Sequence, residues 1–189
     1  MARPFTVSVP DTLAVPCVTG WWSILLDCRQ PSTEVHMDTL RTEYLCDMSV
    51  DLETPQRFGA TPHGTRVIVY AKGGQVDGPN IKGKVLPGGG DWLIIRPDSA
   101  SELDVRGTIQ TDDGHLIYMH WRGIMHAPPA IWQRLQQGER DLDPSLYYYR
   151  IAPMFETASE KYSWLNRLIA VGVGRRTPTG VAYRIYSIL

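Results

Sequence analysis

The stretch that decides the fold is ELDVRGTIQTDDGHLIYMHWRG, residues 102–123. Two runs of alternating polar and apolar residues flank the turn sequence TDDGH, which is typical of a β-hairpin. A three-residue loop over 112–114, with Gly114 in the left-handed conformation, sets Thr111 opposite His115. A loop of two or four residues shifts the register by one and mixes polar with apolar side chains on both faces. We therefore favour the three-residue loop.

In this register the hairpin has one polar and one apolar face, because side chains alternate along a strand. The polar face carries three cross-strand pairs: Asp104 with Arg122, Arg106 with His120, and Thr108 with Tyr118. The apolar face carries Val105, Ile109, Ile117, Met119 and Trp121.

The direction of the polar face allows two interpretations, and the sequence alone does not choose between them. In the first, the polar face is the solvated outside of a sheet and the apolar face is core. In the second, the polar face lines the interior of a barrel, and a helix, an extension or another subunit covers the apolar outside. A barrel of about eight strands can hold one small ligand, and the ion pair of Asp104 with Arg122 would then orient Tyr118 or His120 as acid or base.

Other segments extend the β pattern. Strands are expected at 40–52, 66–78, 80–98, 167–174 and 181–189, with a loop over 54–65 and helical pieces at 128–138 and 157–166. The 17 glycines and 14 prolines are spread between short β-rich runs, as in a β-sandwich or barrel. We expect one domain over 37–189, with residues 1–36 as an N-terminal extension packed on it.

Composition excludes some functions and favours others. A net charge of −1 argues against nucleic-acid binding, which needs a basic face, and there is no polybasic segment for a membrane surface. The start lacks the apolar core of a signal peptide, and the apolar run 21–26 is far shorter than the about 20 residues that cross a bilayer. We expect a soluble protein in the cytoplasm.

Motifs for cofactors and metals are absent from the sequence. LPGGGDW, residues 86–92, lacks the lysine, the Ser/Thr and the helix of a phosphate-binding loop. No GxGxxG or GxSxG pattern occurs. The spacing of His115, His120 and His126 does not favour a metal site, and the three cysteines are interpreted as reduced thiols. We expect no metal and no cofactor.

Three separated motifs resemble one known family. They are KGGQVDGPNIKGKVLPGGGDW, the hairpin sequence, and YYRIAPMFETASEKYSWLNRLIAVGVG. Together they resemble the family called domain of unknown function 3237, over about residues 40–189. The resemblance implies an all-β fold, a single antiparallel β-barrel of about eight strands and of calycin or allene-oxide-cyclase type, with one or two short helices and often oligomeric.

The same resemblance implies site residues and a chemistry. Most members have no assigned activity, but some fungal members are associated with natural-product pathways and cofactor-free ring closure. The recurrent positions without a backbone explanation are Asp91, Trp92, Asp104, Arg106, Tyr118, Glu156 and Trp164. We expect Asp104, Arg106, Tyr118 and Glu156 to be catalytic. We expect Asp91, Trp92, His120, Arg122 and Trp164 to bind the substrate.

Three functions remain open at this point. The first is a cofactor-independent enzyme that isomerises or cyclises a small aromatic or polyketide-like molecule, most concretely by adding a phenol oxygen to an alkene (hydroalkoxylation) in natural-product biosynthesis. The second is a lipocalin-like small-molecule binding protein without catalysis. The third is a structural subunit with a solidly packed barrel. The apolar outer face of the second interpretation above also predicts a homo-oligomer, a dimer or larger.

Overall fold

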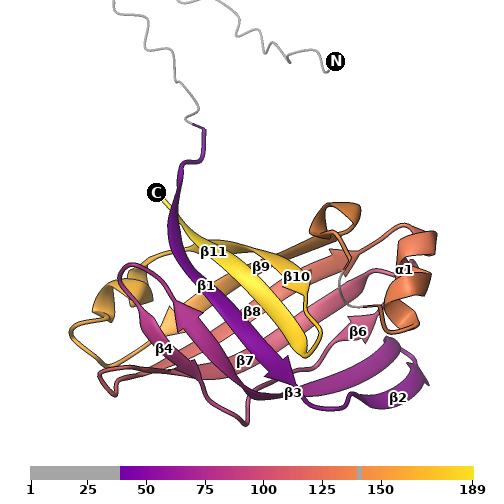
Figure 1. Cartoon of the computed structure of the whole chain (residues 1–189), viewed down its shortest axis with the longest axis horizontal. Coiled ribbons are helices and arrows are strands. Elements are labelled where there is room, and N and C mark those ends of the chain that lie inside the picture. Colours follow the sequence, from indigo (N-terminus) through magenta and orange to yellow (C-terminus); the bar gives the residue numbers. More distant parts are fainter. Residues whose placement is uncertain (1–38, 140–141) are drawn as a thin grey trace, which may run out of the picture. The chain divides into compact units, whose positions relative to one another are not determined.

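The computed structural model describes residues 39–139 and 142–189, and these form a β-barrel with short helical pieces (Figure 1). The predicted extension over 1–36, and its packing on the barrel, lie outside the described residues. The strands are β1 (Thr42–Leu52), β2 (Gln56–Thr61), β3 (Gly64–Asp77), β4 (Lys82–Val85), β5 (Gly90–Asp91), β6 (Ile94–Ile95), β7 (Ser101–Thr111), β8 (Leu116–His126), β9 (Tyr148–Glu156), β10 (Ala170–Arg176) and β11 (Gly180–Ile188). The helices are α1 (Pro129–Gln136) and the 3-10 turns η1 (Pro144–Leu146) and η2 (Ser163–Arg167).

The sheet closes on itself. Its strand order is β1-β11-β10-β9-β8-β7-β4-β3-β2, and an additional pairing of β1 with β3 completes the circle. Strands β4, β5 and β6 follow one another between β3 and β7 and act as one interrupted strand, while β2 pairs only with β3 beside the barrel. Counted in this way, the molecule is an eight-stranded closed antiparallel barrel. The predicted fold class is confirmed.

The hairpin has the predicted register. Asp104 pairs with Arg122, and Arg106 pairs with His120. The backbone amide of Thr111 donates to the carbonyl of His115 over 2.9 Å, and Gly114 has a φ of 90°. The left-handed glycine that a three-residue loop needs is therefore present.

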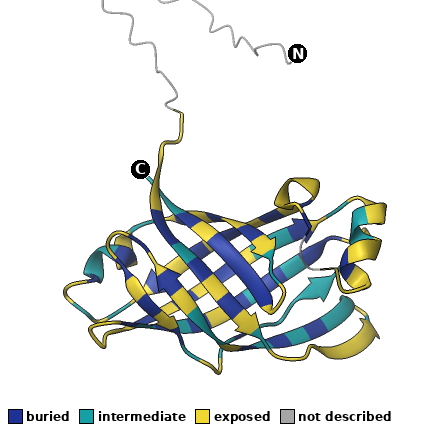
Figure 2. Cartoon of the chain, in the orientation of Figure 1, coloured by how far each residue is buried: buried dark blue, intermediate teal, exposed yellow. Residues whose placement is uncertain are grey.

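The interpretation that placed the polar face inside the barrel is wrong. The apolar face points inward, and its members are between 0% and 8% exposed: Val105, Ile109, Ile117, Met119 and Trp121. Figure 2 shows the alternation of buried and exposed residues along the barrel strands. The physical reason is that the inward side chains of distant strands, such as Ile151 and Ile185, are also apolar and buried, so closure of the barrel joins the apolar faces. An apolar outer face of the hairpin therefore no longer supports the predicted homo-oligomer, which stays a prediction.

Aromatic side chains fill part of the interior. The hydroxyls of Tyr149 on β9 and Tyr183 on β11 form a hydrogen bond of 2.6 Å, and both side chains are buried. The ring of Trp121 packs edge-on against Tyr183, with centroids 5.4 Å apart. Gly174 on β10 makes room for the Tyr149 ring, because a Cβ there would lie only 2.7 Å from it. The interior of the barrel is thus a packed core with two tyrosine hydroxyls within it.

Several local predictions differ from the structure. Part of the expected loop at 54–65 forms β2, because it pairs with the first half of β3. The expected strand at 80–98 is broken into three short pieces, and strand β9 was not expected at all. The expected helix at 157–166 is only the 3-10 turn η2, whereas the expected helix at 128–138 is confirmed as α1. Among the described residues, no helix is both long and apolar enough to cross a membrane.

Candidate active site on the outer face of the barrel

Three neighbouring strands bring a row of side chains together on the outer face. The register of β5 and β6 with β3 and β7 is continuous on both sides of residues 92–93. Trp92 is therefore level with Ile68 on β3 and with Asp104 on β7, and the Trp92 amide donates to the Asp104 carbonyl over 3.0 Å. Because residues that are level across a sheet point to the same side, all three side chains face outward.

Charged side chains surround this row. The Asp104 carboxylate lies 3.0 Å from the Arg106 guanidinium and 3.4 Å from that of Arg122, and it is only 26% exposed. The Arg106 guanidinium also lies over the Trp92 ring, 5.6 Å from its centroid. Arg66 donates a hydrogen bond to the Trp92 carbonyl. Trp92 therefore has one arginine over its ring and a second on its main-chain carbonyl.

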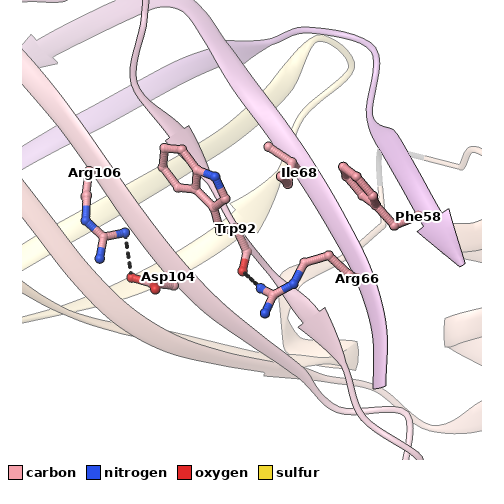
Figure 3. A pocket seen from close by; sticks show the side chains of 6 residues that line it. All are labelled: Phe58, Arg66, Ile68, Trp92, Asp104 and Arg106. Atoms are coloured by element: carbon pink, nitrogen blue, oxygen red, sulfur yellow. Dashed lines mark hydrogen bonds and ion pairs between the residues drawn. The ribbon is translucent and has the colours of Figure 1, made fainter. Parts of the chain in front are cut away.

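These side chains line an open groove of about 630 Å³ (Figure 3). Its lining residues are Phe58, Arg66, Ile68, Trp92, Asp104 and Arg106. Phe58 comes from the irregular part of β2, where the pairing with β3 shifts between Arg57 and Gly59. The groove thus combines aromatic and aliphatic walls with fixed charges, the composition expected of a small-molecule site.

Of the predicted site residues, Trp92, Asp104 and Arg106 lie together in this groove. Three further lining residues, Phe58, Arg66 and Ile68, are not among the predicted site residues. The alternation of β3 is a signal for two of them, because Val67 and Val69 are buried and the residues that alternate with them must face outward. No sequence pattern predicts that Phe58 lines the groove, because its position depends on the irregular pairing of β2.

Asp91 lies on the opposite side of the sheet from the groove. It is level with Val69 and Val105, both of which are buried inside the barrel. Its Oδ1 accepts a hydrogen bond from the backbone amide of Asp104 over 3.0 Å. Burial, which disfavours the charged form, raises the pKa of Asp91 to about 7. The expectation that Asp91 lines the substrate site together with Trp92 does not fit this placement.

The remaining predicted residues lie elsewhere on the outer face. Tyr118 and His120 on β8 stack on each other with ring centroids 5.6 Å apart. Glu156 on β9 is level with Tyr118 and exposed. None of these three lines the groove, while Arg122 touches it only through its ion pair with Asp104.

Trp164 lines a different hollow, of about 380 Å³, together with Asn80, Lys161 and Tyr162. Next to it, Asp113 in the hairpin turn accepts hydrogen bonds from Lys161 over 2.6 Å and from Tyr162 over 3.0 Å. These bonds, with that from Lys161 the largest cause, hold the pKa of Asp113 well below its usual range. This cluster joins the segment before η2 to the β7–β8 turn. Within 39–139 and 142–189, no three His, Cys, Asp or Glu side chains gather as metal ligands.

The fold and the groove define a small closed β-barrel with an aromatic and charged site on its outer face. Residues 40–188 match the family described as "Protein of unknown function (DUF3237)", and the chain belongs to this family. A UPF0311 protein of Rhodopseudomonas palustris (strain TIE-1) is 36% identical over 151 residues, which are 80% of this chain and 98% of that protein. A UPF0311 protein of Clostridium acetobutylicum is 42% identical over 125 residues, 66% of this chain and 78% of that protein.

Solved structures share the barrel. A conserved protein of unknown function from Rhodopseudomonas palustris has a TM-score of 0.77 and 34% identity, over 80% of this chain and 99% of that chain. A β-barrel-like protein from Acinetobacter baumannii has a TM-score of 0.70 and 37% identity, over 80% and 98%. A structure described as an enzyme from Penicillium herquei has a TM-score of 0.60 and 22% identity, over 79% and 95%. At that identity the last likeness concerns the fold alone.

Proposed function

We propose that the protein is a cofactor-independent enzyme that isomerises or cyclises a small, flat, aromatic molecule in the outer groove. The observation that carries the proposal is the convergence of Trp92, Asp104 and Arg106 with Arg66 and Phe58 around one groove of about 630 Å³. The groove is open to solvent, and its volume lies within the range of small-molecule pockets. The groove replaces the barrel interior as the expected reaction site.

The walls of the groove suit an aromatic substrate that carries a phenol or phenolate. Trp92 and Phe58 supply ring faces and edges against which a flat molecule can stack. Arg66 and Arg106 supply guanidinium groups that stabilise negative charge as it develops on a phenol oxygen. Binding and charge stabilisation thus come from different residues of one groove.

Asp104 is the group placed to move a proton. In the concrete version of the proposal, its carboxylate takes the proton of a phenol, and the phenolate oxygen forms a C–O bond to an alkene carbon of the same molecule. As this bond forms, the protonated carboxyl gives its proton to the neighbouring alkene carbon, so that no carbanion develops. The product is an oxygen heterocycle and an isomer of the substrate, so no oxidant, reductant or added atom is needed.

The fold itself is compatible with catalysis. The protein from Penicillium herquei that shares the barrel is described as an enzyme. The relatives from Rhodopseudomonas and Clostridium carry names that assign no activity. The support for the proposed reaction therefore rests on the residues of the groove.

The test is turnover of phenols that carry an ortho allyl or prenyl chain, followed by mass spectrometry in D₂O. Each turnover should give an isomer with one deuterium bound to carbon. Asp104→Asn should lower kcat by at least about 100-fold, the usual contribution of a positioned acid or base. Asp77→Asn is the matched control, because Asp77 is an exposed carboxylate paired with Lys82 at the far end of β3.

The outcomes separate the candidate functions. Turnover that Asp104→Asn leaves unchanged would remove Asp104 from the mechanism. Binding of the phenols in the groove without any product would favour a small-molecule binding protein, although one that uses its outer face and not a lipocalin-like interior.

A further inference from the structure

We propose that Asp91 is a positioning residue that couples the groove to a proton held inside the barrel, so that binding of an aromatic anion in the groove takes up one proton at Asp91. This inference rests on the proposed function only for the class of ligand. It concerns a group on the inner face of the sheet that the proposed reaction does not use.

The coupling runs through one backbone group. The Asp104 amide donates to Asp91 Oδ1 over 3.0 Å, and the Asp104 carbonyl accepts from the Trp92 amide over 3.0 Å. Asp91, at the end of β5, and Trp92, which follows it, thus bind both backbone polar groups of Asp104, the first through its side chain and the second through its main chain. Protonation of Asp91 weakens its hydrogen bond from the amide, because a charged acceptor binds a donor more strongly than a neutral one.

Charged and titratable groups on four strands affect Asp91. Asp104 and Arg66 lie in the groove on the outer face and act across the sheet, whereas two buried tyrosines share the interior with Asp91. Burial is the largest cause of the raised pKa of Asp91. The hydrogen bond from the Asp104 amide lowers this pKa, the charge of the Asp104 carboxylate on β7 raises it, and the charge of Arg66 on β3 lowers it. In turn, the charge of Asp91 adds to the strong effect of burial in raising the pKa of Tyr149 on β9 and of Tyr183 on β11. Both tyrosines therefore stay neutral near pH 7, so their hydroxyls do not release a proton where Asp91 titrates.

The sign of the coupling follows from charge. An anion bound between Arg66 and Arg106 offsets the positive charge of the two guanidinium groups. It also places a negative charge on the outer side of the same sheet. Both effects disfavour the ionised form of Asp91. By linkage, the anion binds more tightly to the protonated protein, so its affinity must fall as the pH rises through the Asp91 pKa.

The probe is 2-naphthalenesulfonate, a flat anion whose charge does not change over the pH range used. Titration calorimetry in buffers of different ionisation enthalpy should find proton uptake on binding near pH 7. The affinity of the wild-type chain should fall roughly five- to tenfold between pH 6 and pH 9, the effect of one charge at roughly 10 Å in a partly polar medium. In Asp91→Asn the proton uptake and the pH dependence should vanish while binding persists.

A control variant and a ligand-free measurement complete the test. His120→Gln is the control variant, because it removes the imidazole that is level with Arg106. Without any ligand, the ¹⁵N and ¹H shifts of the Asp104 amide should titrate with a midpoint near 7, and this titration should be absent in Asp91→Asn.

The results test the coupling and the proposed reaction separately. An Asp104 amide that does not titrate near neutral pH overturns the coupling, whether or not any ligand binds. Proton uptake that survives in Asp91→Asn but disappears in His120→Gln overturns it as well. Neither readout needs turnover, so an Asp91 titration without enzymatic activity would refute the proposed reaction and leave the coupling intact.

Discussion

The burial of Asp91 has a measurable effect on stability. Its pKa of about 7 in the folded chain compares with an ordinary value of 3.8. The folded state therefore binds the proton more tightly than the unfolded state does. The stability that this gives is complete below pH 3.8, and it falls as the pH rises from there through 7. Asp91→Asn removes the titration and retains an oxygen that can accept from the Asp104 amide.

The size of the effect follows from the two pKa values. Each pKa unit corresponds to about 1.4 kcal/mol, so complete ionisation costs the fold at most about 4 kcal/mol. Part of this cost is already present at pH 5, because the unfolded carboxyl is ionised there. Between pH 5 and pH 8 the remaining cost is about 2 to 3 kcal/mol. The wild-type chain should therefore lose this much stability relative to Asp91→Asn over that interval.

The assay is urea unfolding followed by tryptophan fluorescence, with wild type and variant compared at pH 5 and pH 8. Asp113→Asn is the control. Hydrogen bonds, above all from Lys161, hold the pKa of Asp113 below its usual range, so this carboxyl is ionised in both states at both pH values. Its effect on stability should be the same at pH 5 and pH 8. A constant difference between Asp91→Asn and wild type would refute the raised pKa of the partly buried Asp91.

Three further predictions concern the core and the groove. Tyr149→Phe should lower the free energy of unfolding by about 1 to 3 kcal/mol, because it leaves the buried Tyr183 hydroxyl without its partner. In the same urea assay, the double variant with Tyr183→Phe should lose less stability than the sum of the losses in the two single variants. Burial raises the pKa of Cys46 to about 12, so iodoacetamide at pH 8 should modify this thiol only after unfolding, as peptide mass mapping would detect; modification of the native chain would contradict the burial. Trp92→Ala should weaken 2-naphthalenesulfonate binding roughly three- to tenfold in calorimetry, since it removes the stacking surface, and unchanged affinity would exclude Trp92 from the site.

The hairpin illustrates what local sequence determines. Period-two alternation and the glycine in the turn are enough to predict that Asp104 pairs with Arg122. They cannot predict which face is inside, because that depends on the faces of distant strands. Only closure, which brings the buried side chains of β9 and β11 against those of β7 and β8, decides the direction.

The site is predictable to a smaller extent. Trp92, Asp104 and Arg106 follow from the family resemblance, while Arg66 requires the register of β3 against the interrupted strand. Asp91 precedes Trp92 in the chain, and adjacent strand residues face opposite sides. That rule of alternation is by itself enough to place the two side chains on different faces of the sheet.

The central claim is that the outer groove, and not the barrel interior, binds the ligand. A crystal structure of the chain with 2-naphthalenesulfonate tests this most directly. We expect the naphthalene ring against Trp92 and Phe58, with the sulfonate on Arg66 and Arg106. A ligand found inside the barrel beside Tyr149, or one bound beside Trp164 with the groove empty, would contradict it.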